Sequence, residues 1–372
     1  MPEKRVQIRS IILTALNQGE LAVGSRLPTE HELARQYGIS RATIREGIAS
    51  LVQEGILTRR RGAGTFVASL TPENGSKIIA AIVPCMRSHR DSFGESIRVI
   101  EDRLHEDGYS MILCNHENDP TRAQRYVHRL SRDGVSGVIF APVHLPNREE
   151  VNLRIVRQLE TRNLPFVLMG TPISRETLSR FSIVSTDGFS ASRQIVRHLM
   201  GLGHQRIAYI RFEGVFTDDE RYSGYLEEMR LQGLNVPAEY VRNVKPVAVE
   251  LQGQEEVRQL LNLPQPPTAV ICLHDLAARN VMEEVQRLGL RIPQDLAVTG
   301  FGDLHFAARL DPPLTTVRLP IQEEAELLVK LLFEKVRGVS AGEQQVFLNA
   351  DLVVRQSCGA VSARESQVLS NL

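Results

Sequence analysis

The first 70 residues carry apolar side chains at two different spacings. Apolar positions recur every three or four residues in the segments 8–16, 33–37 and 44–52, which predicts three short amphipathic helices. Runs of β-forming residues at 56–58 and 65–67 enclose a glycine-containing loop and predict a hairpin. Because a tight turn separates the second and third helices, the segment has the pattern of a helix-turn-helix followed by a β-hairpin wing.

The polar residues between these helices match the chemistry of helix ends. Thr29 and Glu32 have the spacing of a capping box at the start of the second helix. Gly38 can end that helix, Ser40 can cap the third, and Gly55 can end the third. The apolar pattern and the caps therefore predict the same boundaries.

From residue 78 onward, strand-length apolar runs alternate with helix-length amphipathic stretches. This alternation predicts parallel sheets joined by right-handed crossovers. About seven such units suit two sheets better than one, with a ligand crevice beyond the carboxyl ends of the strands. The predicted strands are 78–83, 109–114, 135–140, 165–169, 206–210, 268–273 and 296–301, and the predicted helices are 94–107, 121–132, 150–162, 188–201, 218–232, 252–261 and 275–288.

The composition is that of an ordinary globular protein, but the charge is unevenly distributed. Of the 372 residues, 42% are hydrophobic and 24% are charged, and the formal net charge is zero. Residues 1–70 contain ten basic and six acidic residues, a net charge of +4 that the rest of the chain balances. A basic segment on a neutral or acidic body indicates nucleic acid as a partner.

Neither the cysteines nor the N-terminus has the features of an exported protein. The four cysteines, Cys85, Cys114, Cys272 and Cys358, lie far apart without metal-ligand spacing, which fits a reducing compartment. The N-terminus lacks an apolar signal core, and no apolar run approaches the length that crosses a membrane. We therefore expect a soluble, cytoplasmic protein with no membrane partner and no cofactor.

The third helix and the hairpin carry chemistry suited to DNA. Arg41, Thr43 and Arg45 lie on the first turn and a half of the helix, off its apolar stripe. In helix-turn-helix proteins this end meets base edges in the major groove, where an arginine can donate two hydrogen bonds to guanine. The basic tip at 59–64 is suited to phosphates or the minor groove. The alternatives are an ordinary solvated loop, or a winged helix that binds protein or RNA.

Residues 5–68 resemble the GntR-type winged helix. The motifs that carry the resemblance are Leu27-Pro28-Thr29-Glu30, Gly38-Ile39-Ser40-Arg41-Ala42-Thr43-Ile44-Arg45 and Gly62-Ala63-Gly64-Thr65-Phe66-Val67. The resemblance implies DNA contacts from both helices and from the wing. The residues predicted to contact DNA are Lys4, Glu30, Arg35, Ser40, Arg41, Thr43, Arg45, Arg60, Arg61, Gly62 and Thr65.

Residues 78–358 resemble the effector domain of LacI/GalR regulators, which shares its fold with periplasmic sugar-binding proteins. The motifs include Gly134-Val135, Gly203-His204, Val298-Thr299-Gly300-Phe301 and Pro313-Leu314-Thr315-Thr316-Val317. The resemblance implies two lobes joined by three crossing strands, which close on a ligand by a hinge motion.

The predicted fold class is α/β: a winged helix-turn-helix plus a two-lobed, periplasmic-binding-protein-like domain with parallel sheets. We expect a DNA-binding domain at 1–68, a linker at 69–77, an effector-binding and dimerisation domain at 78–358 and a disordered tail at 359–372. We expect lobe 1 at about 78–174 and 321–345, and lobe 2 at about 175–319 and 346–358.

The predicted cleft keeps one familiar residue and departs at others. Arg221 matches the arginine that the family places there, which is suited to hydroxyls, a carboxylate or a phosphate, although an arginine can also bridge two loops. Sugar-binding relatives commonly carry polar groups where this chain has Gly170 and Leu319, which argues against a simple pentose or hexose bound in the usual way. The predicted effector-binding residues are Ser88, Phe93, Arg221, His274 and Asp303, with His116 as a further candidate.

The leading interpretation is a homodimeric, sequence-specific DNA-binding regulator. Its binding to a double-stranded operator would be controlled by a small-molecule effector, a sugar or sugar derivative, and repression is favoured over activation by the resemblance. One alternative is a DNA-binding regulator whose ligand-free cleft serves only dimerisation. Another is an enzyme. No nucleophile elbow, phosphate loop or dinucleotide fingerprint is present in the sequence, so we expect no catalytic activity.

Overall fold

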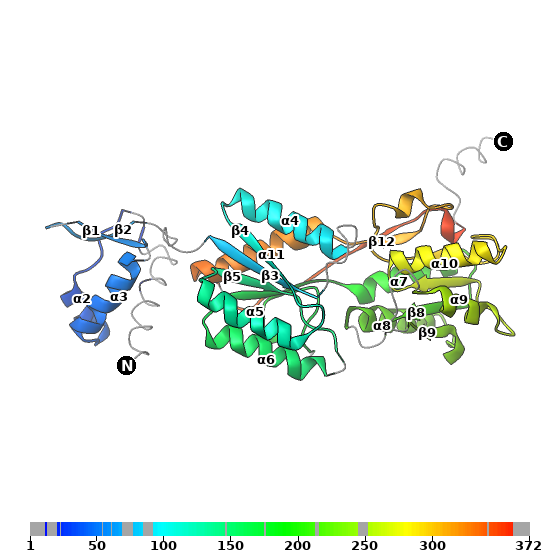
Figure 1. The fold of residues 1–372 in the computed structure, drawn as a ribbon, viewed down its shortest axis with the longest axis horizontal. Coiled ribbons are helices and arrows are strands. Elements are labelled where there is room, and N and C mark those ends of the chain that lie inside the picture. The colour runs from blue at the N-terminus through cyan, green and yellow to red at the C-terminus, as the bar shows by residue number, and fades with distance from the viewer. Residues whose placement is uncertain are drawn as a thin grey trace.

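The computed structural model describes most of the chain as an N-terminal head and two lobes (Figure 1). The described residues are 12, 21–22, 24–53, 55–60, 62–68, 77–84, 92–145, 147–174, 176–212, 216–244, 252–340 and 342–359. The first predicted helix apart from Ile12, most of the predicted linker and nearly all of the predicted tail lie outside them. Across the described residues, no helix combines the length and apolar character needed to cross a membrane.

The head confirms the expected helix-turn-helix and wing. Helix α2 (Glu30–Tyr37) begins with the Thr29–Glu32 capping box and ends at Gly38 in the left-handed conformation. Helix α3 (Arg41–Gln53) follows at once and buries its apolar stripe, Ile44, Ile48 and Leu51. Strands β1 (Leu57–Arg60) and β2 (Gly64–Val67) pair antiparallel. The buried apolar side chains of these elements form one small core.

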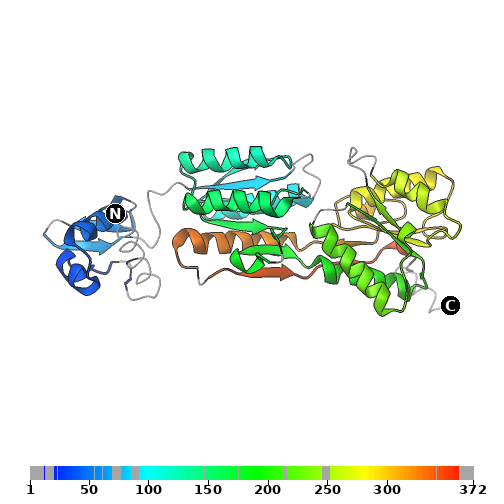
Figure 2. The same ribbon diagram turned by 90° about the horizontal axis from the view of Figure 1, so that it is seen from below.

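The first lobe is a parallel sheet covered by helices on both faces (Figures 1 and 2). The strand order is β13-β7-β6-β5-β3-β4. Helices α5 and α6 pack on one face, and α4 and α11 pack on the other. The elements are β3 (Ile78–Val83), α4 (Ser92–Glu106), β4 (Ser110–Asn115), α5 (Pro120–Asp133), β5 (Gly137–Phe140), α6 (Arg148–Thr161), β6 (Phe166–Met169), β7 (Ile183–Thr186), α11 (Ile321–Arg337) and β13 (Gln345–Leu348).

The second lobe has a smaller parallel sheet in the order β11-β10-β8-β9. Helices α7 and α8 cover one face, and α9 and α10 cover the other. A two-stranded antiparallel sheet of β12 and β14 lies beside them. The elements are α7 (Gly188–Gly201), β8 (Ile207–Arg211), α8 (Phe216–Leu231), β9 (Val241–Asn243), α9 (Gln254–Leu261), β10 (Ala269–Cys272), α10 (Asp275–Arg287), β11 (Ala297–Thr299), β12 (Thr316–Arg318) and β14 (Asp351–Val353).

Three short stretches of chain connect the lobes, as the sequence predicted. They lie between β7 and α7, between β12 and α11, and between β13 and β14. The segments of the first lobe were expected to end at about residues 174 and 345, and in the structure both end later. Strand β7 pairs with β6 and with the whole of β13, so the segments of the first lobe extend to Thr186 and Leu348.

Candidate functional site: a basic helical face and an interlobe cleft

The start of α3 presents polar and basic side chains away from the core. The Ser40 hydroxyl accepts a hydrogen bond from the Thr43 N–H (3.2 Å) and shares another with the Thr43 hydroxyl (2.8 Å). Arg41 and Arg45 are exposed, and Thr43 is half-buried between them. Since Ile44 is fully buried on the opposite side, the helix is fixed with its basic face outward.

Glu30 at the start of α2 orients two of these arginines. Its carboxylate lies 2.9 Å from Nη2 of Arg45 and 3.6 Å from Nη2 of Arg59. Hydrogen bonding to Glu30, followed by its charge, raises the pKa of Arg45. Arg45 nevertheless keeps 58% of its side chain exposed. Glu30 therefore connects α3 and the wing through one carboxylate, a contact that the sequence alone did not reveal.

The wing carries its own basic groups. The Arg60 guanidinium lies over the Phe66 ring, 4.7 Å from its centroid, which fixes the direction of the side chain. Gly62 at the tip has φ 76° and is exposed, and Thr65 is half-buried. Arg35 is exposed at the end of α2. Lys4 and Arg61, also predicted to contact DNA, lie outside the described residues.

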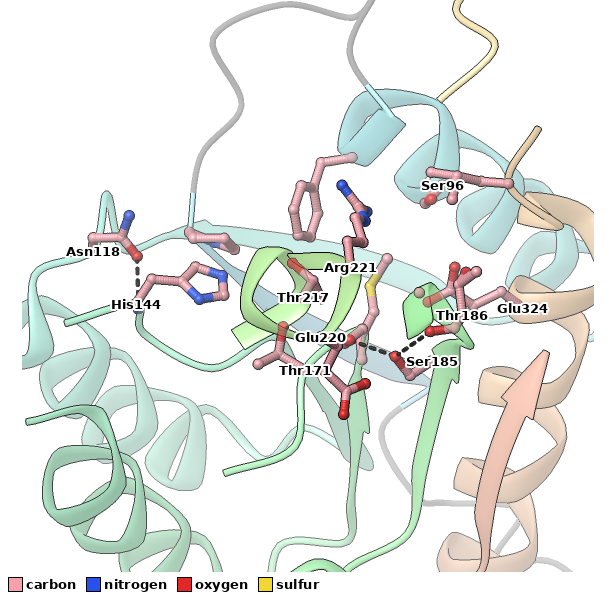
Figure 3. Close-up of a pocket in the computed structure, with 16 residues that line it drawn as sticks. Ser96, Asn118, His144, Thr171, Ser185, Thr186, Thr217, Glu220, Arg221 and Glu324 are labelled. Atoms are coloured by element: carbon pink, nitrogen blue, oxygen red, sulfur yellow. Dashed lines mark hydrogen bonds between the residues drawn. The ribbon is translucent and has the colours of Figure 1, made fainter. Parts of the chain in front are cut away.

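A cavity of about 310 Å³ lies between the two lobes (Figure 3). Strands β3, β5, β6 and β7 run parallel, so their carboxyl ends face it together, as in other open α/β sheets. The N-terminal ends of α4, α7, α8 and α11 complete the walls. The lining residues are Pro84, Phe93, Ser96, Asn118, His144, Met169, Gly170, Thr171, Ser185, Thr186, Gly188, Thr217, Glu220, Arg221, Leu319 and Glu324.

Arg221 is the cation of the second-lobe wall. One Nη donates to the Leu273 carbonyl (2.9 Å), and the guanidinium stacks on Phe301, 3.6 Å from the ring centroid. Burial lowers its pKa, although Tyr209, Asp218 and other neighbours act in the opposite direction. Its Nε is buried without a hydrogen-bond partner in the described structure. Arg221 therefore does bridge to a loop, and still has a donor that no protein group satisfies.

Two ionisable side chains of the first lobe line the cavity without having been predicted. Burial, helped by nearby positive charge, lowers the pKa of His144 to about 4, so the ring is neutral near pH 7. The backbone N–H of His144 donates to Asn118 (3.1 Å), which fixes the loop after β5. Burial raises the pKa of Glu324 to about 7. His144 follows β5 and Glu324 lies in the first turn of α11, but no motif in the local sequence marks either residue as part of a cleft.

The predicted effector-binding residues are only partly brought together. Phe93 and Arg221 line the cavity, whereas Ser88 lies outside the described residues. His274 does not line the cavity: its ring accepts the N–H of Ala277 (3.0 Å) and caps α10. The further candidate His116 is fully buried beside the Ala141 carbonyl, away from the cavity wall.

Asp303 also departs from its expected place. Its carboxylate binds Arg318 (2.7 Å) and Arg355 (2.6 Å), so it ties the loop after β11 to the segments around β12 and β14. The backbone of Asp303 has φ 52°, a conformation that aspartate tolerates better than most residues. Asp303 therefore connects parts of the second lobe to one another, since both carboxylate oxygens already have protein partners.

An ion pair connects the two lobes outside the residues that line the cavity. Arg148 of α6 lies 3.4 Å from Asp219 of α8, and Asp219 also pairs with Arg211 of β8. These contacts join a helix of the first lobe to a helix of the second, so they help to set the separation of the lobes.

Comparison with known proteins identifies both parts of the chain. Residues 4–67 match the gntR family of bacterial regulatory proteins, and residues 196–358 match the periplasmic binding protein-like domain. An arabinose metabolism transcriptional repressor from Geobacillus stearothermophilus is 28% identical over 364 residues, which cover 95% of this chain and 97% of the relative. That similarity spans head and lobes together.

Solved structures resemble the two-lobed part. The crystal structure of a LacI-family regulatory protein from Chloroflexus aggregans is 26% identical, with a TM-score of 0.66, covering 76% of this chain and 98% of that one. A complex of the transcriptional regulator CelR with cellobiose has a TM-score of 0.68 at 22% identity, covering 89% of this chain and all of that one. The second likeness shows the shared fold alone.

Proposed function

We propose that this chain, which joins a gntR-type winged helix to a periplasmic binding protein-like domain, is a transcriptional repressor whose operator binding is controlled by a small molecule in the interlobe cleft. The observation that carries the proposal is the exposed basic face at the start of α3, beside a basic wing and opposite a fully buried apolar stripe. A winged helix that presents arginines in this way fits the major groove.

The cleft favours the interpretation in which a ligand controls DNA binding over the alternative in which a ligand-free cleft serves only dimerisation. Arg221 and His144 each carry a buried nitrogen on the cavity wall that no described protein group satisfies, and such groups cost free energy until a ligand or water pairs with them. The ligand would be a sugar or sugar derivative, as the names of the arabinose and cellobiose regulators suggest. It would act by favouring one arrangement of the lobes, typically by about 1–3 kcal/mol.

The proposal includes a cytoplasmic homodimer without catalytic activity, resident metal or cofactor. Two heads are needed to read the two half-sites of a symmetric operator, which lie about 10 bp apart along the groove. The edge strand β4 leaves Ile112 and Leu113 37% and 41% exposed, an apolar edge that a second copy would cover. Sedimentation of the purified protein tests the dimer.

Gel shift with DNA from the promoter next to the gene tests the head. Arg45→Ala should cost about 1–3 kcal/mol at the operator and remove its preference over unrelated DNA. Arg129→Ala is a matched control, because Arg129 is an exposed arginine on α5 of the first lobe. If Arg45→Ala selected the operator as well as the wild type does, the assignment of α3 as the recognition helix would be refuted.

A further inference from the structure

We propose that Glu324 selects the ligand of the cleft by accepting hydrogen bonds from the hydroxyl groups of a neutral, polyhydroxylated molecule. The inference rests on the proposed function, because it assumes that the cleft is an effector site. It goes beyond that function by assigning specificity to one carboxyl group on α11 and by excluding anionic ligands.

Glu324 differs from the other buried acids of the described structure. The carboxylate of Glu228 lies 2.8 Å from Arg193 and from Arg197, and that of Glu284 lies 2.6 Å from Arg258 and from Arg287. The remaining buried acids, Asp218, Glu256 and Asp275, each accept a backbone N–H. The side chain of Glu324 is part of a residue only 7% exposed, yet within the described structure it has neither a hydrogen bond nor an ion pair.

The unpaired carboxyl group lies on the wall of the cavity (Figure 3). The carboxyl oxygens stay accessible from the cavity, but their enclosure removes part of their hydration without a replacing protein partner, which is unfavourable. The core positions around it on α11 are apolar, for example Ala325 and Leu328. The arrangement is therefore understandable if the partner of Glu324 is a ligand.

The charges of the wall decide against an anionic ligand. Among the described lining residues, Arg221 is the one cation, and Glu220 and Glu324 are two acids. His144 is neutral near pH 7, because burial holds its pKa at about 4. Among these described residues a phosphate or carboxylate would meet no net positive charge, whereas a neutral ligand can be bound by hydrogen bonds alone.

The remaining wall is complementary to a polyol. Arg221 can only donate hydrogen bonds, and Glu324 as a carboxylate can only accept them. A hydroxyl group does both, so the hydroxyls of one polyol can pair with Arg221 and with Glu324. Phe93 and Met169 add apolar surface suited to the C–H face of a sugar ring.

The proposal predicts a pH dependence that a purely structural glutamate would not have. Burial raises the pKa of Glu324 to about 7 in the empty cleft, and hydroxyl donors favour the carboxylate form. Affinity should therefore be about tenfold lower at pH 6 than at pH 8. The other ionisable groups on the cavity wall are Glu220 and Arg221 from α8 and His144 after β5, while α4, which packs on α11, contributes the uncharged Ser96.

The test is calorimetric titration of the full-length protein with arabinose, xylulose and cellobiose as neutral probes, and with arabinonate and arabinose 5-phosphate as anionic ones. We expect a neutral sugar to bind the wild type more tightly than either anion. Glu324→Gln should weaken that binding at least tenfold at pH 8 and remove its pH dependence. Glu323→Gln is the matched control, since Glu323 is the exposed neighbour in the same helical turn.

Each other result overturns the inference. Equal sugar binding by the wild type and Glu324→Gln would remove Glu324 as the selecting group, and a preference for arabinonate or the phosphate would remove the neutral class. The absence of binding by all five probes would also refute it. Gel shift on the same samples judges the proposed function separately, because operator binding by the head does not depend on which ligand the cleft accepts.

Discussion

Replacing Glu324 by glutamine should stabilise the ligand-free protein, and the gain should grow with pH. Burial raises the pKa of this carboxyl group from 4.5 to about 7, so the folded state resists its ionisation while the unfolded chain does not. Below pH 4.5 the carboxyl group is neutral in both states and the free energy of unfolding is unaffected. As the pH rises to 7, the unfolded chain ionises first and the free energy of unfolding falls progressively. The difference of about 2.5 pKa units corresponds to about 3 kcal/mol above pH 7.

The assay is differential scanning calorimetry of the wild type, Glu324→Gln and the control Glu323→Gln between pH 5 and pH 8, without ligand. The advantage of Glu324→Gln should be about 1 kcal/mol at pH 5 and about 3 kcal/mol at pH 8, a rise in Tm of ~6–12 °C at the higher pH. Glu323→Gln should show no such trend, because its side chain is exposed. A gain of equal size at both pH values, or no gain at pH 8, would show that ionisation of the Glu324 carboxyl group does not lower the stability of the folded protein.

Three further predictions follow from single contacts. In Gly224→Ala the new Cβ would lie 2.2 Å from the Phe189 carbonyl oxygen, so α8 must move from α7, and the melting temperature of the second lobe should fall by several degrees in a circular dichroism melt. Arg148→Gln removes the ion pair with Asp219, which should favour the open arrangement of the lobes. Effector binding should weaken about two- to fivefold in a titration, and an unchanged affinity would show that this pair does not contribute to lobe closure. Glu30→Gln should strengthen binding to unrelated DNA several-fold in low salt and reduce operator preference, because Arg45 is then no longer held; a filter-binding assay that found both unchanged would contradict the positioning role of Glu30.

The sequence predicted the elements that carry a strong repeating pattern. The helices of the head follow from apolar spacing and from caps such as Thr29 and Gly38, and the structure has both caps in place. Most of the main strands of the two lobes are apolar runs bounded by glycine or polar residues, so their positions were also predictable. Strands β7, β9, β12, β13 and β14 were not predicted, because runs of three or four residues outside the regular strand-helix alternation hold too little of a pattern to be distinguished from a loop.

The candidate site was predictable where a motif marks it and hidden where the fold assembles it. Arg221 and Phe93 were found, because each follows a recognisable strand or motif. Glu324 lies on α11, a helix that the strand-helix alternation did not include, and it reaches the cleft only because the chain crosses back to the first lobe after β12. His274 and Asp303 were expected in the cleft from their positions after strands, but local capping and ion pairing direct both side chains elsewhere.

The connection of the two lobes has a consequence for the order in which a ribosome can complete this protein. The head needs residues up to about 68, whereas the sheet of the first lobe is unfinished until β13 has emerged and paired with β7. Domains that are complete early in translation fold first. A nascent or prematurely terminated chain would therefore have a folded DNA-binding head before the domain that controls it is complete, and a chain ending short of residue 345 would lack both the finished effector cleft and the complete first lobe on which the proposed dimer depends.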